Sequence, residues 1–383
     1  MELSIIGSGT MGIGIAHACA EKNHKVFIID SSNESLKSGK EKLFKLLEKL
    51  VQKGKYSEEN KNTITKNLNF SNDLSDIKNS DFVIEAIIEN LDIKKKVFKD
   101  IEELVSSECI IASNTSSLSI ASIASSCVKN DRVIGIHFFN PANLMPLVEV
   151  IPAIQTSQST LEKSKEFLID LGKTVVIAKD TPGFIVNRVA RPFYGESLRI
   201  YEEGIANFET IDWALKEIGG FKMGPFELMD YIGNDINYTV TETVFKEFYY
   251  DPRYKPSFTQ KRLMEAGFLG KKSGKGFYDY KNLTEKKINT NREEGKKIVL
   301  RVLSMLINEA ADALFLNIAS KEDIDLAMTR GVNYPKGLLS WADEIGIDNI
   351  LKILKELNNK YCEDRYRPSP ILAQLSSENK TFF

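Results

Sequence analysis

The chain has few of the residues from which disulfide frameworks and metal sites are built. Its 383 residues include four cysteines and three histidines. The cysteines lie far apart, and none forms a Cys-x-x-Cys pair. This spacing excludes a disulfide framework and a zinc site, and it fits a reducing compartment. Three histidines are too few for a His-rich site, so we expect no bound metal.

Long apolar runs and a net charge of either sign are also missing. No apolar run reaches the ~18 residues that a membrane-spanning helix needs. The N-terminus, with an acidic second residue and early glycines, does not read as a signal peptide. The 51 Lys and Arg against 53 Asp and Glu give a net charge of −2, which excludes a chain-wide attraction to nucleic acid. We expect a cytoplasmic protein with no membrane or nucleic-acid partner.

The first half of the chain alternates short apolar runs with helical patterns, which predicts βαβ units and a parallel sheet. We expect strands at 3–6, 25–29, 81–86, 109–113, 132–136, 146–150 and 175–178, and helices at 12–21, 94–106 and 119–126. Residues 35–66, with leucines at helical spacing and many lysines, predict a helical hairpin. It is either a solvated amphipathic pair or a contact for a phosphate-bearing ligand. From Thr181, a predicted N-cap, the chain turns helical, so we place a domain boundary near residue 180.

The helical half contains an internal repeat. Residues 196–233 align without a gap on residues 309–346, with eleven identities in thirty-eight positions. Repeats of this kind indicate one structural unit that occurs twice. We therefore predict three domains, at 1–180, 181–284 and 285–383, with a charged linker at 284–295 between the helical copies.

A glycine motif follows the first predicted strand. Gly7-Ser-Gly-Thr-Met-Gly12 has the GxGxxG spacing, opens a helix, and is followed by Asp30 at the end of the next strand. Gly7 permits a tight turn, Gly9 lets the backbone approach a pyrophosphate, and Gly12 allows close packing of helix on sheet. Asp30 can accept hydrogen bonds from ribose hydroxyls and would repel a 2′-phosphate, which favours NAD over NADP. FAD-binding proteins use the same motif, and a glycine turn that binds no ligand is the other alternative.

One histidine stands where open α/β sheets bind their ligands. His137 comes directly after the predicted strand 133–136, at its carboxyl end. Glu149 lies among apolar residues, and a buried carboxylate is costly unless it is paired. An imidazole is its natural partner, and a carboxylate that fixes the tautomer makes the other ring nitrogen a base. We predict a His137–Glu149 pair; His137 taken alone could equally be a structural histidine.

Two further polar segments are candidates for substrate contacts. Residues 113–117, Ser-Asn-Thr-Ser-Ser, follow another strand end, where hydroxyls could hold a substrate oxygen. The alternative, an N-cap for the next helix, accounts for one residue of the five. Asn187 lies early in the first helix of the second domain, and by itself it could be a surface residue. Gly270–Phe277 resembles a phosphate loop, but its spacing is wrong, and we read it as a structural loop.

Seven motifs occur in the order known from one enzyme family. They are GSGTMGIGIAHACA, EAIIEN, SNTSSLSI, IHFFNPANLMPLVEV, DTPGFIVNR, MGPFELMDYIG and GKKSGKGFYDY. Together they resemble the L-3-hydroxyacyl-CoA dehydrogenases, including 3-hydroxybutyryl-CoA dehydrogenases, over residues 1 to about 282. The resemblance implies an α/β fold: an N-terminal Rossmann-type doubly wound domain followed by two tandem all-α domains of the family's C-terminal type.

The resemblance also implies roles for matching residues. His137 would be the general base, Glu149 its orienting carboxylate, and Ser116 and Asn187 contacts for the substrate oxygens. The implied NAD contacts are Gly7, Gly9, Thr10, Met11, Gly12, Asp30, Glu89, Lys94, Asn114 and Asn140. The lysine-rich hairpin resembles the family's coenzyme A-contacting segment, which makes Lys49, Lys53 and Lys55 candidates for substrate binding.

The implied reaction is the reversible oxidation of an (S)-3-hydroxyacyl-CoA, of short chain such as 3-hydroxybutyryl-CoA, to a 3-ketoacyl-CoA with NAD. A related sugar-acid dehydrogenase and a non-catalytic NAD-binding scaffold are the alternatives. In the second helical copy Leu300 stands at the position of Asn187. We therefore expect that copy to have lost catalytic equipment and to pack on the first in place of a partner subunit.

Overall fold

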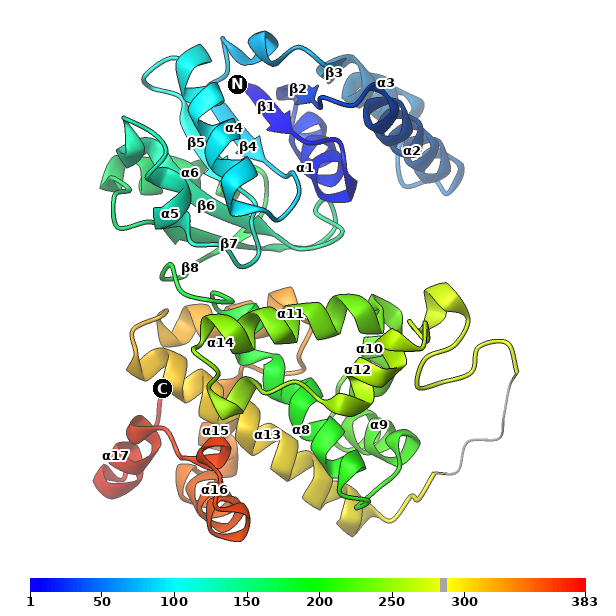
Figure 1. Ribbon diagram of the computed structural model, residues 1–383, viewed down its shortest axis with the longest axis vertical. Helices are drawn as coiled ribbons and strands as arrows, with labels where there is room; N and C mark the ends of the chain where they lie inside the picture. Colours follow the sequence, from blue (N-terminus) through cyan, green and yellow to red (C-terminus); the bar gives the residue numbers. More distant parts are fainter. Residues whose placement is uncertain (283–287) are drawn as a thin grey trace. The chain divides into compact units, whose positions relative to one another are not determined.

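The computed structural model describes residues 1–282 and 288–383. The chain divides into two compact units, Met1–Phe184 and Ile185–Phe383. Figure 1 shows strands and helices in the first unit and helices in the second. The boundary lies four residues beyond the one expected from the sequence, and both helical copies belong to one compact unit. Among the described residues, no helix combines the length and apolar character needed to cross a membrane.

The first unit is built on a sheet with strand order β3-β2-β1-β4-β5-β6-β7-β8. Every neighbouring pair is parallel except β6 and β7, which run antiparallel. The strands are β1 Glu2–Ile6, β2 Lys25–Ile29, β3 Leu68–Ser71, β4 Phe82–Glu85, β5 Ile110–Ser113, β6 Val133–Phe138, β7 Leu147–Pro152 and β8 Thr174–Ile177. Each predicted strand is present, and β3 is one that the sequence pattern did not predict.

The register of the ladder brings several strand ends to one edge. Ile6 of β1 pairs with Ile29 of β2 and with Glu85 of β4, which in turn pairs with Ser113 of β5. The residues that follow these strands therefore meet at the same carboxyl edge. Because Ser113 pairs with Gly135, β6 continues past this edge.

Helices connect the strands of the first unit. They are α1 Thr10–Glu21, α2 Asn33–Gln52, α3 Glu58–Asn67, α4 Leu91–Leu104, α5 Ile120–Ala124 and α6 Gln158–Asp170. The expected helical hairpin is confirmed as α2 and α3, which lie beside β2 and β3 in Figure 1. The sequence pattern did not predict α6, because only a few apolar residues lie in a largely polar segment there.

The second unit consists of helices. They are α7 Val186–Val189, α8 Arg191–Glu202, α9 Phe208–Glu217, α10 Pro225–Ile232, α11 Asn234–Glu247, α12 Phe258–Glu265, α13 Arg292–Phe315, α14 Lys321–Gly331, α15 Leu338–Ile345, α16 Ile347–Tyr361 and α17 Pro370–Glu378. The expected N-cap at Thr181 is wrong, because its carbonyl closes a turn with the amide of Phe184 and the first helix begins later. The predicted linker overlaps α13 from Arg292 on, and its residues 284–287 lie outside the described part.

The repeat is visible in matching helix bounds and matching hydrogen bonds. Adding 113 to the bounds of α10 gives those of α15. Asp212 of the first copy accepts hydrogen bonds from the amides of Phe226 and Glu227, both at 2.9 Å. Asp325 of the second copy accepts them from Leu339 and Ser340 at 2.8 and 2.9 Å. In both copies, one buried aspartate thus holds the first turn of the next helix.

The two copies exchange buried ion pairs. Arg188 of the first copy donates from Nε to Glu309 of the second at 2.6 Å, and Tyr254 of the first copy also donates to Glu309. Arg301, the counterpart of Arg188, donates from Nε to Glu196 at 2.5 Å. This exchange is reciprocal, as in an isologous twofold interface, although both halves are one chain. Helix α13 packs against α8 and α9, so the copies also share an apolar core.

We predict that Glu309→Gln destabilises the second unit by about 3 kcal/mol, because the buried guanidinium of Arg188 loses its nearer carboxylate and retains Asp312, which it shares with Arg253. Denaturant unfolding measures this loss. Lys336→Ala, which removes the exposed Lys336–Glu344 pair, is the control and is expected to cost about 0–1 kcal/mol. Equal losses in the two variants would contradict the prediction.

Candidate active site

The glycine motif forms a turn that only small residues fit. Gly7 has φ +107°, and a Cβ there would lie 2.6 Å from the carbonyl oxygen of Ala86. A Cβ on Gly12 would lie 1.9 Å from the carbonyl oxygen of Gly7. At Gly9, by contrast, a Cβ would meet no protein atom within 4 Å. Gly7 and Gly12 are therefore required by the turn itself, whereas Gly9 leaves room for a group outside the chain.

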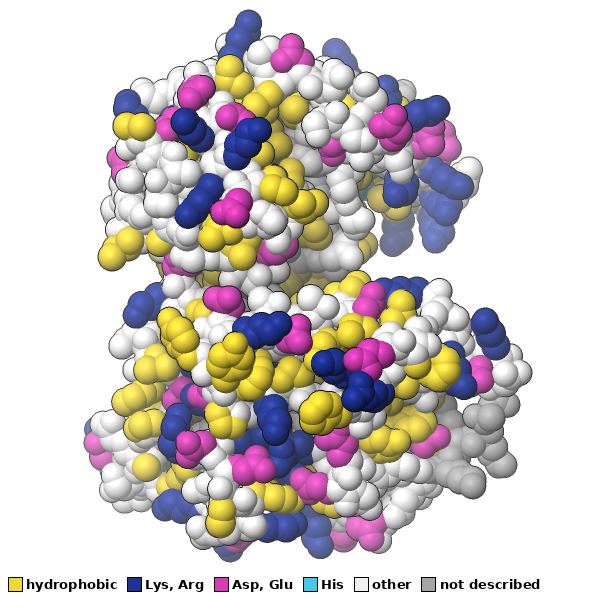
Figure 2. Space-filling view, viewed as in Figure 1, with side chains coloured by type: hydrophobic (Ala, Val, Ile, Leu, Met, Phe, Trp, Pro, Cys, Tyr) yellow, Lys and Arg dark blue, Asp and Glu magenta, His cyan; other side chains and the backbone are white. Residues whose placement is uncertain are grey.

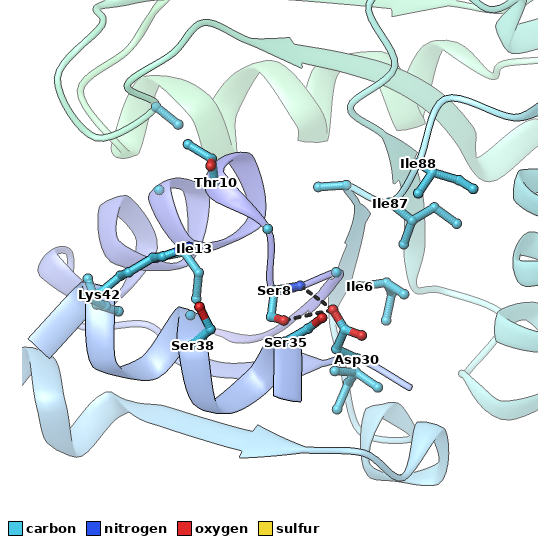
Figure 3. A pocket seen from close by; sticks show the side chains of 18 of the residues that line it. Ile6, Ser8, Thr10, Ile13, Asp30, Ser35, Ser38, Lys42, Ile87 and Ile88 are labelled. Carbon is cyan, nitrogen blue, oxygen red and sulfur yellow. Dashed lines mark hydrogen bonds between the residues drawn. The ribbon is translucent and has the colours of Figure 1, made fainter. Parts of the chain in front are cut away.

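A cavity of about 1040 Å³ opens in front of this turn. Its lining comes from the glycine turn, the end of β2, the loop after β4, the inner face of α2 and residues 140–143. Figure 3 shows Ser8 and Asp30 on one side of it, Thr10 at the start of α1, and Ser38 and Lys42 along α2. The N-terminus of α1 faces this space with free N–H groups, which suits a pyrophosphate. A dinucleotide therefore fits the turn and the cavity.

Asp30 is held in place by the glycine turn. Its Oδ2 accepts hydrogen bonds from the amide of Ser8 at 2.9 Å and the Ser8 hydroxyl at 2.7 Å, and its Oδ1 accepts one from the amide of Ser32 at 3.0 Å (Figure 3). Partial burial raises the pKa of Asp30, but these hydrogen bonds outweigh it and hold the pKa below its ordinary value. Asp30 is thus a fixed anion on the cavity wall, as the preference for ribose hydroxyls requires.

A buried lysine lies between two glutamates beyond the end of β4. Lys94 Nζ is 2.6 Å from Oε1 of Glu85 and 3.3 Å from Oε2 of Glu89. Glu85 and Lys94 are both almost completely buried, so each compensates the charge of the other. Burial raises the pKa of Glu89. Lys94 and the hydrogen bonds from residues 115 and 116 outweigh this effect, so the pKa lies below its ordinary value. Glu85 was not predicted as a site residue from the sequence, although it ends an apolar strand. A carboxylate among apolar strand residues is the same signal that identified Glu149.

Glu89 gathers the polar segment that follows β5. Its Oε1 accepts hydrogen bonds from the hydroxyl of Thr115 at 2.6 Å and the amide of Ser116 at 2.9 Å, and the hydroxyl of Ser116 lies 3.3 Å away. Ser113 donates to Glu85 at 2.7 Å. The N-cap of α5 is Ser119, so the alternative that one of residues 113–117 caps this helix is wrong. The structure brings Glu89, Lys94 and Ser116 together as one network.

His137 and Glu149 form the predicted pair. They are directly opposite each other on the antiparallel strands β6 and β7, and Nδ1 of His137 is 2.7 Å from Oε2 of Glu149. The sequence placed His137 after its strand; the structure places it within β6, which continues past the ends of its neighbours. The ring packs against Phe139 and Phe184, with centroids 4.6 and 5.9 Å apart. A buried imidazole with one nitrogen on a carboxylate can accept a proton at the other nitrogen.

The remaining predicted site residues lie in different parts of the structure. Asn140 lines the cavity, and Asn114 accepts a hydrogen bond from the amide of Phe138 at 2.8 Å, close in sequence to His137. Met11 and Gly12 lie in the first turn of α1. Asn187 lies in α7 of the second unit.

The three candidate lysines lie at the end of the hairpin. Lys49, Lys53 and Lys55 are exposed near the end of α2 and just beyond it, and they are not among the cavity-lining residues. Figure 2 shows Lys and Arg side chains gathered over this hairpin. Lys42, seven residues before Lys49 in α2, lines the cavity and was not predicted. The role of Lys49, Lys53 and Lys55 in substrate binding stays a prediction.

Both units match known domain families. The NAD-binding domain of 3-hydroxyacyl-CoA dehydrogenase matches residues 2–181. The C-terminal domain of 3-hydroxyacyl-CoA dehydrogenase matches twice, at residues 183–280 and 298–381. The double match confirms the repeat, and the first match identifies the cofactor as NAD.

Individual relatives agree with these matches. The chain is 35% identical to 3-hydroxyadipyl-CoA dehydrogenase of Escherichia coli, over 97% of this chain and 96% of that protein. It is 40% identical to pig mitochondrial hydroxyacyl-coenzyme A dehydrogenase, over 73% of this chain and 91% of that protein. A crystal structure of 3-hydroxybutyryl-CoA dehydrogenase from Escherichia coli superposes with a TM-score of 0.94, at 34% identity and 99% coverage of both chains.

We predict that two alanine substitutions in the glycine turn affect different properties: the first affects NADH binding and the second affects stability. Gly9→Ala is expected to leave the thermal unfolding midpoint unchanged and to weaken NADH binding at least ~10-fold, because the added methyl group occupies space needed by the pyrophosphate. Gly12→Ala is expected to lower the unfolding midpoint, because its methyl group meets the carbonyl of Gly7. Differential scanning fluorimetry and NADH fluorescence titration measure the two effects. Normal NADH affinity in Gly9→Ala would contradict this assignment of the pyrophosphate position.

Proposed function

The chain belongs to the 3-hydroxyacyl-CoA dehydrogenase family of NAD-dependent oxidoreductases, and from this we propose that it catalyses the reversible oxidation of (S)-3-hydroxyacyl-CoA to 3-ketoacyl-CoA. The observation that carries the proposal is the buried His137–Glu149 pair at 2.7 Å, in the same unit as the glycine turn. Family membership favours this reaction over a sugar-acid dehydrogenase or a non-catalytic scaffold.

His137 is proposed as the general base. A carboxylate can only accept hydrogen bonds, so Nδ1 of His137 carries the hydrogen that Glu149 receives. Nε2 has no hydrogen-bond partner within the part of the chain that is described, and its lone pair can take the proton of the substrate hydroxyl. Glu149 stabilises the imidazolium that forms. In the reducing direction the protonated His137 returns this proton as the acid.

The other residues position the reactants. Bound NAD supplies the hydride acceptor for the substrate C3. Ser116 and Asn187 are proposed to hydrogen-bond the substrate oxygens, and Glu89 orients Ser116 through the amide and the hydroxyl of that residue. Glu89 and Lys94 are proposed to line the nicotinamide side. Holding donor and acceptor carbons in near-attack geometry can lower the barrier by several kcal/mol.

The substrate is proposed to be a short-chain acyl-CoA, such as 3-hydroxybutyryl-CoA. Relatives with similar sequences carry names for two acyl groups, 3-hydroxyadipyl and 3-hydroxybutyryl, and both are short. The exposed lysines at the end of α2 are proposed contacts for the phosphates of coenzyme A.

We predict that His137→Gln lowers kcat by a factor of about 10²–10⁴, because the reaction loses its general base, while NADH binding is retained. NADH oxidation with acetoacetyl-CoA measures kcat, and fluorescence titration measures NADH affinity. The same assay with 3-ketoacyl-CoA substrates of about four to sixteen carbons is expected to show the highest kcat/KM at the short end.

The control is His24→Gln, since His24 lies at the far end of α1 from the glycine turn and faces Asp170. It is expected to leave kcat unchanged. Near-normal activity of His137→Gln would remove His137 as the base, and an inactive wild-type protein would remove the proposed reaction.

We propose further that the second helical copy replaces a partner subunit, so that the protein is monomeric through an internal pseudo-dimer. The reciprocal pairs Arg188–Glu309 and Arg301–Glu196 support this, because they use the same positions of the repeat in both directions. Sedimentation equilibrium at micromolar concentration is expected to give the mass of one chain. A tight dimer that buries α8 against another chain would contradict the proposal.

A further inference from the structure

A lysine between α6 and β8 holds the loop that joins β6 to β7. This β6–β7 loop comprises residues 139–146. Nζ of Lys173 donates to the carbonyl oxygen of Ala142 at 2.6 Å and to that of Met145 at 2.9 Å. No other group within residues 1–282 and 288–383 donates to either oxygen. In this part of the chain, Lys173 is therefore the group that satisfies both carbonyls.

The sheet places Lys173 beside this loop. Thr174 begins β8 and pairs with Leu147, the first residue of β7. The amide of Thr174 also donates to the carbonyl of Pro146 at 2.8 Å. Lys173, one residue earlier, therefore lies next to the end of the β6–β7 loop, and its long side chain reaches back to Ala142.

The β6–β7 loop forms part of the wall of the cofactor cavity. Residues 140–143 line the cavity together with the glycine turn. Ala142 is buried and lies against α1, where a Cβ on Gly14 would be 3.2 Å from the Cβ of Ala142. Packing thus seats the loop on α1, and Lys173 holds it through its carbonyls. Movement of this loop would displace Asn140, one of the predicted NAD contacts.

The chemistry of lysine suits this arrangement. An ammonium group has three N–H donors, so one side chain can serve two carbonyls with charge-assisted hydrogen bonds. Burial lowers the pKa of Lys173, although Cys19 and Glu21 of α1 act against this, so enclosing the ammonium group opposes its charged form. Without these donors, the carbonyls of Ala142 and Met145 would need water, which favours a displaced loop.

We propose that Lys173 is a positioning residue for NAD binding, which fixes the β6–β7 loop as a wall of the cofactor cavity and so keeps Asn140 in place. Lys173 is not among the cavity-lining residues, so it acts through the loop and not by contact with the cofactor. The inference rests on the proposed function, because it takes this cavity as the NAD site, and it adds a residue that contacts neither reactant.

Lys173→Met tests the proposal, because methionine retains much of the length of the side chain and removes its N–H donors. We expect NADH to bind about 10-fold more weakly, which is the effect of losing a hydrogen bond from a charged group. We expect the KM for NADH to rise by a similar factor while kcat at saturating NADH stays within about twofold of the wild type. Lys173→Arg restores charge and donors and is expected to recover most of the affinity. Fluorescence titration measures NADH affinity, and reduction of acetoacetyl-CoA gives KM and kcat.

Lys165→Met is the matched control. Lys165 of α6 is partly buried in the same unit, pairs with Glu162 at 3.1 Å and does not line the cavity, so NADH affinity is expected to stay unchanged. Asn140→Ala completes a double-mutant cycle with Lys173→Met. Because the two residues are coupled through one loop, Lys173→Met is expected to weaken NADH binding less in the Asn140→Ala background than in the wild type.

Thermal unfolding separates positioning from stability. A lower unfolding midpoint of Lys173→Met with unchanged NADH affinity would mean a purely structural lysine and would overturn the inference. Equal losses of affinity from Lys173→Met in the two backgrounds, or the same loss in Lys165→Met, would also overturn it. If Lys173→Met does not fold, Lys173→Gln, with a shorter and uncharged side chain, carries the same expectations. A wild type that binds NADH without reducing acetoacetyl-CoA would contradict the proposed function alone, since the titrations need no turnover.

Discussion

Compensation of buried charge is the constraint on which both units depend. Ionised side chains inside a fold are tolerated only where an opposite charge or several hydrogen-bond donors lie beside them. In the first unit this pairs Glu149 with His137 and Glu85 with Lys94. In the second it pairs the glutamates of each helical copy with arginines of the other.

The arrangement of strands in the sheet brings the site residues together. Parallel strands end together, so the residues after β1, β2, β4 and β5 meet at one edge. The antiparallel pair β6 and β7 then carries His137 past this edge with Glu149 directly opposite. His137, Glu149 and the glycine turn therefore belong to one unit, and both side chains are held on strands, which position groups more precisely than loops do.

The duplication gives the second unit two tasks. Equivalent residues such as Asp212 and Asp325 perform the same capping in each copy, because capping depends on local geometry alone. Other positions differ between the copies: Leu300 stands at the position of Asn187, and Tyr334 at the position of Phe221. The second copy thus keeps the packing contacts of the repeat although Asn187 is not preserved in it.

Much of the site could be predicted from the sequence, since its signals are local. The GxGxxG spacing, the acid after β2 and a histidine beside a strand end are each read within a few residues. The pairing of Glu149 with His137 followed from the rule that a buried carboxylate needs a partner. Glu85 carried the same signal and was missed, while α6 and β3 were missed because their apolar patterns are weak.

The sequence by itself determined the fold class, the cofactor turn, the repeat and the family, because strand and turn propensities and motif spacing act over short stretches of chain. Only the tertiary structure decided which carboxylate each arginine and lysine meets, and that Glu89 holds residues 115 and 116. Those contacts join residues up to 169 positions apart in the sequence, as in the pair Arg365–Glu196. They depend on packing of whole elements, which no local pattern encodes.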